Sequence, residues 1–253
     1  SNNLSSIFGG SYSDYTHVSN NTSRSHQGRA TGYSWCSNFR IDNNIFQCIG
    51  SGVAIELLNM QGTNYKSDNN CLYAPNASIG EFNNTVYSTM AQWQALGFDT
   101  ASLNENPLFD DLTFHPHAVV LDEQAIPYAH ITDDHEGDDR HPTTPDIGAD
   151  EFDPLTADAG ILSILYPKMP FPTGTNPVYV RFYNNSGDTL QSVQFDWEVN
   201  GLAQPSFIWN GLLERGAVYD SLEIGQFDFV PFTPYQVKIW VRQPNGMTDQ
   251  LAI

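Results

Sequence analysis

The chain of 253 residues carries 29 acidic against 10 basic residues, which gives a net charge of −19. This excess of carboxylates argues against nucleic acid and anionic membranes as partners, because both require a basic surface. No apolar run approaches the roughly 20 residues that span a bilayer, so we expect no direct membrane insertion. The length allows two domains, each with its own core. Residues 1–30 have no apolar signal-peptide core, and we expect the chain to be part of a longer protein.

Residues 1–35 have no steady hydrophobic period and predict irregular loops around short strands. Four aromatic residues fall in or next to these loops: Tyr12, Tyr15, Tyr33 and Trp35. They could form an exposed platform on which a sugar ring stacks, although core filling is the commoner role of such residues.

An Asp-Asn-Asn motif at residues 42–44 returns at residues 68–70, 26 positions later, with apolar residues following in phase. Repeats of this length are typical of solenoids, in which each coil is too small to bury its own apolar side. Asp42 and Asp68 would then lie one coil apart, and Asn side chains would bond along the stack at each bend. The alternative is that Asn pairs recur by chance in an Asn-rich chain.

Two further elements are predicted in the first half of the chain. Residues 88–97 predict a helix that a Ser-Thr pair caps at its start. Residues 118–121 predict a short apolar strand.

The three cysteines, Cys36, Cys48 and Cys71, have an irregular spacing that gives no disulfide framework. Their apolar surroundings favour buried free thiols. A Cys36–Cys48 bridge is the alternative.

Several short motifs follow the repeat: Gly97-Phe98-Asp99, Asn106-Pro107-Leu108-Phe109, Thr132-Asp133 and Asp146-Ile147-Gly148-Ala149-Asp150-Glu151-Phe152. Together they resemble the C-terminal part of secreted right-handed parallel β-helix proteins of the pectate-lyase-like superfamily, whose chains close on a DIGAxE seal. The resemblance covers residues 36–153 and implies the last coils and the end cap of such a helix over residues 1–153. Members of that group normally carry many more coils upstream.

The pattern of apolar and polar residues changes after Pro154. Residues 161–165, 178–183, 193–199 and 235–241 alternate apolar and polar side chains, as half-buried antiparallel strands do. About seven strands in a hundred residues predict an immunoglobulin-like β-sandwich. Asn200-Gly201 and Asn245-Gly246 predict tight turns. The succession Asp158-Ala159-Gly160-Ile161, Asn184-Asn185-Ser186-Gly187, Val199-Asn200-Gly201, Trp209-Asn210-Gly211 and Trp240…Pro244-Asn245-Gly246 resembles the bacterial adhesion-related CARDB-type module, which implies such a module over residues 154–253. We therefore expect an all-β chain, a parallel β-helix followed by a sandwich.

Residues 133–153 are strongly acidic and contain one basic residue, Arg140. The carboxylates that could supply the hard oxygen ligands of a calcium ion are Asp133, Asp134, Glu136, Asp138 and Asp139. Their spacing differs from that of an EF-hand loop. We favour a structural cap instead, in which Arg140 pairs with Asp146 or Glu151 and pins the loop.

Two histidines, His115 and His117, have the spacing of some zinc sites. Pro116 interrupts the strand that this spacing needs, and no third ligand follows at a convincing distance. We therefore expect structural histidines.

No catalytic constellation stands out, and we predict no catalytic residue within this chain. Arg40 and Lys66 are conceivable bases for a polysaccharide lyase, but the acidic residues cluster away from them. Asp42 and Asp68 could flank a sugar from neighbouring coils, yet as members of the repeated bend they are better explained as structural.

Three Asp-Ser/Thr-apolar tripeptides place Thr100, Thr189 and Ser221 in a short signal that resembles bacterial O-glycosylation sites. Such tripeptides are also common by chance.

The β-helix and CARDB resemblances imply a large bacterial protein, secreted or held at the cell surface and exported by the type IX route of gliding bacteria. We expect a non-catalytic structural or adhesive segment whose partners are polysaccharide or other surface and secretion components. The alternatives are a carbohydrate-active enzyme with its catalytic coils upstream, and calcium-dependent carbohydrate binding.

Overall fold

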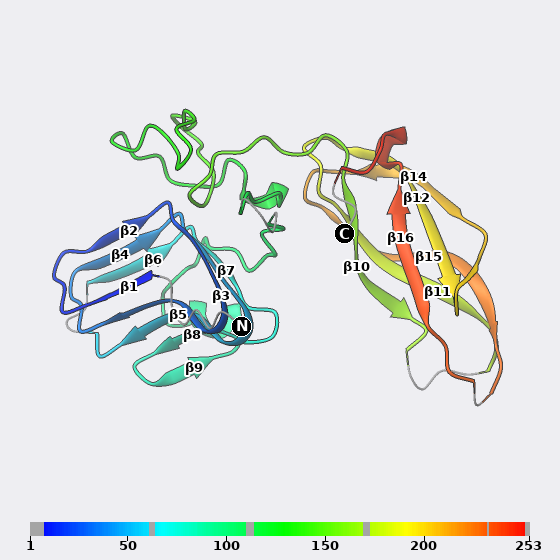
Figure 1. Cartoon of the computed structure of the whole chain (residues 1–253), viewed down its shortest axis with the longest axis horizontal. Helices are drawn as coiled ribbons and strands as arrows, with labels where there is room; N and C mark the ends of the chain where they lie inside the picture. The colour runs from blue at the N-terminus through cyan, green and yellow to red at the C-terminus, as the bar shows by residue number, and fades with distance from the viewer. Residues whose placement is uncertain (1–7, 61–63, 110–113, 169–172, 232, 251–253) are drawn as a thin grey trace. The chain divides into compact units, whose positions relative to one another are not determined.

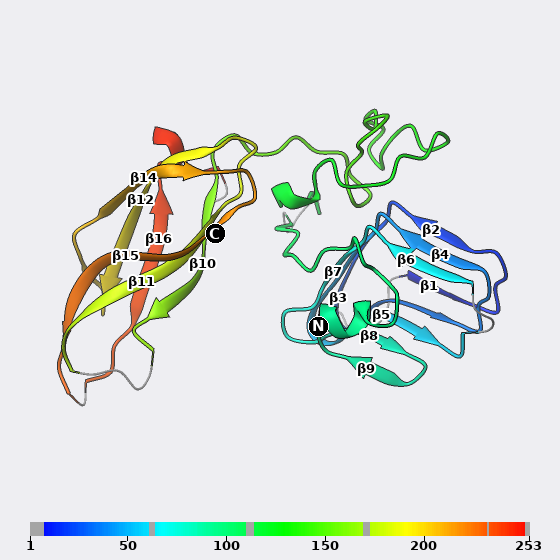
Figure 2. The ribbon, with the colours of Figure 1, turned by 180° about the vertical axis from the view of Figure 1, so that it is seen from behind.

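The computed structural model describes residues 8–60, 64–109, 114–168, 173–231 and 233–250 (Figures 1 and 2). Strands make up most of the regular structure, so the prediction of an all-β chain is confirmed. The chain divides into two compact units, residues 1–153 and 154–253. Within the described residues, every helix is too short to cross a membrane.

The first unit is built from two sheets. In spatial order, one sheet contains β1 (Phe8–Ser11), β3 (Thr22–Ser34), β5 (Ile45–Leu58), β8 (Ser78–Phe82) and β9 (Thr85–Tyr87), with β7 (Cys71–Tyr73) also paired to β5. The other contains β2 (His17–Ser19), β4 (Phe39–Asp42) and β6 (Tyr65–Asp68). Neighbouring strands run parallel, except that β8 and β9 form an antiparallel pair. Successive turns of the chain therefore lie on one another, and we call residues 8–103 the stack (Figure 1).

The repeated motif lies on neighbouring turns of the stack, as predicted, because Asp42 pairs with Asp68 in register. Asn44 and Asn70 are completely buried one turn apart, and Asn44 Nδ2 donates to Asn70 Oδ1 at 3.0 Å. Asn21 donates to Asn44 in the same way, also at 3.0 Å. The backbone N–H of Asn44 shares the same acceptor on Asn70, at 2.9 Å. This asparagine column (Asn21, Asn44 and Asn70) satisfies backbone groups where the chain bends.

The asparagine column ends on Asp99, whose carboxylate is completely buried. Its Oδ1 accepts bonds from Asn70 at 2.9 Å and from the Ser102 hydroxyl at 2.6 Å. Its Oδ2 accepts the indole N–H of Trp93 at 2.7 Å. Burial raises the pKa of Asp99, and these bonds oppose the shift. The column therefore terminates on a buried group that is stabilised by its neighbours.

The predicted helix at 88–97 is present but shorter, as α1 (Met90–Gln94). Thr89 accepts from the N–H of Gln92, and the Gln92 side chain accepts from the N–H of Thr89, which makes a capping box. Gly97, left-handed at φ 91°, turns the chain away soon after the helix ends.

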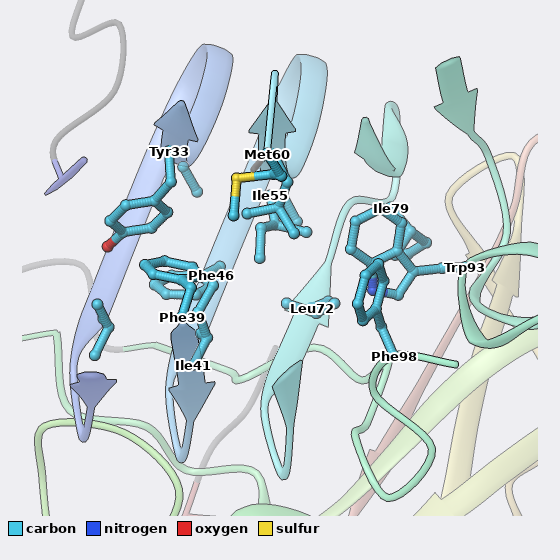
Figure 3. Close-up of a cluster of buried hydrophobic side chains, with 14 of the residues drawn as sticks. Tyr33, Phe39, Ile41, Phe46, Ile55, Met60, Leu72, Ile79, Trp93 and Phe98 are labelled. Carbon is cyan, nitrogen blue, oxygen red and sulfur yellow. The ribbon is translucent and has the colours of Figure 1, made fainter. Parts of the chain in front are cut away.

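The interior of the stack is apolar (Figure 3). Phe39 and Phe46, from β4 and β5, are buried in the same cluster. At the other end of that cluster Trp93 packs on Phe98, with ring centroids 5.5 Å apart. Each turn contributes only a few of these side chains, so the core exists only once the turns have stacked.

The predicted strand at 118–121 is wrong, because Val119–Leu121 forms a single 3₁₀ turn, η1. Leu121 is nevertheless buried, in a cluster with Ile45 and Cys71. A short apolar run indicates burial, but it does not choose between a strand and a buried turn.

All three cysteines are free and buried, so the Cys36–Cys48 bridge is not formed. Burial raises the pKa of the Cys71 thiol to about 12. We expect none of the thiols to react with a disulfide reagent in the folded chain and all three to react in concentrated guanidinium. A thiol that reacts fast before unfolding, measured by absorbance of the released aryl thiolate, would contradict this burial.

The second unit contains two antiparallel sheets. One consists of β10 (Ala159–Tyr166), β11 (Gly174–Asn184) and β15 (Val218–Phe229). In the other, β12 (Leu190–Val199) pairs with β13 (Leu202–Ala203), β14 (Phe207–Leu213) and β16 (Val237–Arg242). Val178, Val180 and Phe182 on β11 are completely buried in one cluster with Phe195 and Trp197 on β12. The predicted period of two along residues 178–183 is therefore confirmed.

Candidate functional site

The candidate site lies in the irregular chain of residues 114–153, which we call the closing segment. Its backbone binds the stack at several points, among them three N–H groups. The N–H of Gly148 donates to Asn43 O at 2.9 Å, and that of Ile126 donates to Asn43 Oδ1 at 2.9 Å. The N–H of Ala149 donates to the hydroxyl of Thr22 at 3.1 Å. The closing segment is therefore fixed on the turns that carry the Asp-Asn-Asn repeat.

Arg140 holds the end of the closing segment from inside, with its side chain only 3% exposed. Its guanidinium donates to Glu151 Oε2 at 3.2 Å and to the backbone carbonyls of Asp146 and Gly148 at 3.2 and 2.8 Å. Of the two partners considered from the sequence, Glu151 supplies the carboxylate and Asp146 a carbonyl. Glu151 also accepts the N–H of His141 at 2.8 Å. We call Arg140 and Glu151 the arginine latch.

The Asp146 carboxylate is buried beside the latch. Its Oδ1 accepts the N–H of Glu123 at 2.7 Å, and its Oδ2 accepts the N–H of Phe152 at 2.8 Å. Burial raises the pKa of Asp146 to about 7, the two N–H bonds oppose this, and the charges of Glu151 and Asp122 add to it. Asp146 is thus a carboxyl group that titrates several pH units above its unfolded value.

This shift predicts how stability depends on pH. Since the pKa of Asp146 is higher in the folded than in the unfolded chain, the folded state binds more protons, and its stabilising contribution is full below pH 4 and is lost as pH rises toward 7. We expect the free energy of unfolding of the native chain, relative to that of Asp146→Asn, to fall by more than about 1 kcal/mol between pH 4 and pH 7. Urea melts of both proteins across this range measure the difference. A difference that stays constant with pH would contradict the assignment.

The five carboxylates proposed for calcium are not gathered at one point. Asp134 Oδ1 accepts three backbone N–H groups, from Glu136, Gly137 and Asp138, at 2.8, 2.9 and 3.0 Å. Burial acts to raise the pKa of Asp134, but the N–H bonds, including one from Glu151, outweigh it and lower the value to about 2. Asp134 therefore caps a tight turn in its ionised form.

The other members of that set point to different places. Asp138 and Asp139 line a surface pocket with Asp122, Glu123 and Asp153. The described residues hold two groups of three side chains close enough to share one ion, and neither includes Asp133, Asp138 or Asp139. Within the described residues the five carboxylates are therefore not drawn into one ligand group, and the calcium site stays a prediction.

The two groups are His115, Glu136 and Asp150, and Asp134, His135 and Asp150, each with ligand atoms within 4.8 Å of one another. We call these five residues the His–Asp cluster. Asp150, at their centre, has a side chain only 4% exposed. Its Oδ2 lies 2.6 Å from His115 Nδ1, and its Oδ1 lies 3.7 Å from His135 Nδ1. His115 Nε2 lies 3.5 Å from Glu136 Oε2.

Sequence reasoning missed the His–Asp cluster, although it considered three of its members separately. His115 and Glu136 lie far apart along the chain, and Asp150 was read only as part of the closing DIGADEF motif. His117, the other histidine of the HPH motif, belongs to neither ligand group. The one feature of the sequence that could have indicated the cluster is His135, a histidine within the acidic residues 133–139.

A second polar site lies in a groove over the larger sheet of the stack. The groove is lined by Gly28, Arg29, Gly52, Val53, Glu56, Glu81 and Val86. Glu56 and Glu81 are register partners on β5 and β8, and Arg29 forms an ion pair with Glu56. Burial raises the pKa of Glu56, Arg29 opposes the shift, and Glu81 adds to it. The sequence analysis did not single out these residues, because their meeting depends on the register of three strands.

Of the residues considered for catalysis, Asp42, Asp68 and Arg40 are engaged in the fold, whereas Lys66 is exposed on β6. Asp42 is buried, forms an ion pair with Arg40 and lies 3.0 Å from His17 Nε2. Asp68 accepts the N–H of Ala101 at 2.7 Å and the hydroxyl of Thr100 at 3.3 Å. Both carboxylates therefore act as structural acceptors at the bends.

The four aromatic residues near the first turns separate into two groups. Tyr33 is buried in the core, whereas Tyr12, Tyr15 and Trp35 are 78%, 80% and 43% exposed. Tyr12 and Trp35 stack with ring centroids 5.8 Å apart and planes 3° from parallel. Both are left-handed, at φ 56° and 58°, while Asn59 occupies the same position one turn on, at φ 49°. Asn tolerates this conformation far better than a bulky residue does, so the exposed aromatic pair is kept at a cost in strain.

Of the three tripeptide hydroxyls, Thr100 and Ser221 are exposed. Thr189 is partly buried and donates to Glu214 at 3.1 Å.

Comparison of the whole chain with protein-family models, with curated proteins and with solved structures finds no match. The assignment of function therefore depends on the residues themselves.

Proposed function

We propose that this chain is a non-catalytic adhesive segment of a large secreted or cell-surface bacterial protein. In this proposal the first unit is the last coils and end cap of a right-handed parallel β-helix of the pectate-lyase-like type. The second unit is an immunoglobulin-like sandwich of the CARDB type. The in-register parallel turns of the stack and the two antiparallel sheets of the second unit support this assignment. Secretion by the type IX route and a polysaccharide partner follow from the same resemblance and are part of the proposal.

The observation that carries adhesion is the strained, exposed pair Tyr12 and Trp35. Aromatic side chains offer apolar faces to sugar rings, and backbone strain on exposed residues indicates a role outside the core. Asp42 and Asp68 are committed to the bends, as described above, and Glu56 is committed to Arg29. These residues therefore favour binding of a ligand on the surface of the stack over acid catalysis by its carboxyl groups.

The test combines a glycan array with an assay for new reducing ends. We expect the chain to be retained on at least one polysaccharide without releasing reducing ends, and Trp35→Ala to weaken retention at least tenfold. The matched control is Trp240→Ala, a similarly exposed tryptophan on β16, which should leave retention unchanged. Absence of retention on every glycan, or equal retention by both variants, would contradict the proposal.

The second candidate is a carbohydrate-active enzyme, and the register pair of Glu56 and Glu81 is the observation that favours it. Neighbouring strands place side chains about 5 Å apart, a spacing at which two carboxylates can act on a glycosidic bond. If reducing ends do appear, Glu81→Gln should abolish them, whereas Glu214→Gln in the second unit should not. That result would replace the adhesive proposal with the enzymatic one.

A further inference from the structure

The His–Asp cluster gathers two imidazoles and three carboxylates from parts of the closing segment that are distant in sequence. His115 precedes η1, residues 134–136 form a tight turn, and Asp150 belongs to the final motif. We propose that this cluster binds a divalent transition-metal ion of the zinc class. The proposal is independent of the adhesive function and differs from the calcium set expected from sequence.

The choice of metal follows from the donor atoms. Calcium takes oxygen ligands, six to eight of them, whereas imidazole nitrogen suits zinc, copper and nickel. Each ligand group here contains one histidine with two carboxylates, and Asp150 belongs to both groups. Three protein ligands with a fourth position open to water form a common zinc arrangement.

One pair of donor atoms in each ligand group lies close to the spacing that such an ion needs. Ligands bound tetrahedrally at 2.0–2.1 Å lie about 3.4 Å from one another. The Nε2 of His115 lies 3.5 Å from Glu136 Oε2, and the Nδ1 of His135 lies 3.7 Å from Asp150 Oδ1. The 2.6 Å contact between His115 Nδ1 and Asp150 Oδ2 is a hydrogen bond. With an ion on Nε2 of His115, this bond fixes the ring and its tautomer, so Asp150 supports His115 through Oδ2 and presents Oδ1 beside His135.

The cluster is also held in place without an ion. Asp134 is fixed through Oδ1 by three N–H groups and through Oδ2 by the N–H of Glu151 at 3.1 Å. Asp150 is buried, while the side chains of His115, His135 and Glu136 are 31%, 45% and 47% exposed. Asp134 and Asp150 are thus held by the fold, whereas His115, His135 and Glu136 are accessible to an ion from solvent. Three carboxylates against two imidazoles also leave negative charge at the centre, which a cation would neutralise.

The test uses the whole chain with zinc chloride alone as the probe, after treatment with chelator. We expect zinc to raise the melting temperature and to bind with a measurable isotherm in calorimetry, while calcium at the same concentration leaves the melting temperature unchanged. His135→Ala and His115→Ala should each weaken zinc binding 10- to 100-fold. The matched control is His26→Ala, an exposed histidine on β3 outside the cluster, which should bind zinc as the native chain does.

A second readout does not depend on how the variants fold. In the native chain, zinc should shift the imidazole resonances of His115 and His135 together and leave that of His26 in place. Failure of zinc to shift the melting temperature or these resonances would overturn the proposal. So would a zinc effect that both histidine variants retain, or a calcium effect as large as that of zinc.

Discussion

Replacing Asn70 by Ala is expected to lower the free energy of unfolding of the first unit by roughly 3–5 kcal/mol. The side chain is completely buried and makes five hydrogen bonds, which join Asn44 to Asp99 at the last position of the asparagine column. Its loss leaves the N–H of Asn44 without its acceptor and removes the Asn70 bond to the buried carboxylate of Asp99, which keeps those from Ser102 and Trp93. A buried polar group left unpaired costs about 1–3 kcal/mol, and more when it is charged.

Hydrogen exchange followed by mass spectrometry in urea measures this effect, because it follows the two units separately. The matched control is Asn210→Ala, an exposed asparagine on β14, which should change stability by less than about 0.5 kcal/mol. If Asn70→Ala were as mild as the control, the column would not be what holds neighbouring turns together.

Replacing Arg140 by Met is expected to destabilise the first unit by about 3–5 kcal/mol, because it breaks the arginine latch from one side only. Glu151 would remain half-buried without its cation, and the carbonyls of Asp146 and Gly148 would lose their donor. Methionine keeps much of the volume of the side chain, so the effect reports the lost bonds more than a cavity.

A double-mutant cycle measures the coupling energy between Arg140 and Glu151 separately from the other effects of each substitution on stability. Glu151→Gln combined with Arg140→Met should cost clearly less than the sum of the two single changes, because the partners act on one another. Arg181→Met, which breaks an exposed pair with Asp220 on the second unit, should cost less than about 1 kcal/mol. Strict additivity between Arg140 and Glu151 would show that their contact contributes nothing.

The repeat and the alternation predicted the parts of the fold that depend on local pattern. Asp42 and Asp68 fall on neighbouring turns because identical bends recur at one period, and residues 178–183 alternate because one face of β11 is buried. The prediction was wrong where local pattern and burial diverge. Ala118 and Leu121 are apolar because they pack against Ile45 and Cys71 of the stack, and this role does not require a strand.

The candidate site could be predicted only in part. Arg140 and Glu151 were identified because they lie close together in sequence, within the motif that ends the first unit. The His–Asp cluster could not be predicted in the same way, since it joins His115 to Asp150 through an irregular path that no periodicity specifies. Glu56 and Glu81 meet through strand register, which becomes known only once the turns are stacked.

We conclude that the closing segment is folded onto the stack as part of one cooperative unit. Native-state hydrogen exchange tests it most directly, through peptides that cover residues 143–152 and residues 68–74. We expect both to be protected with similar opening free energies, because the amides of Gly148 and Ala149 donate to Asn43 and Thr22 and that of Cys71 donates to Asn44. Exchange of residues 143–152 at the rate of an unfolded peptide, while residues 68–74 stay protected, would contradict the account.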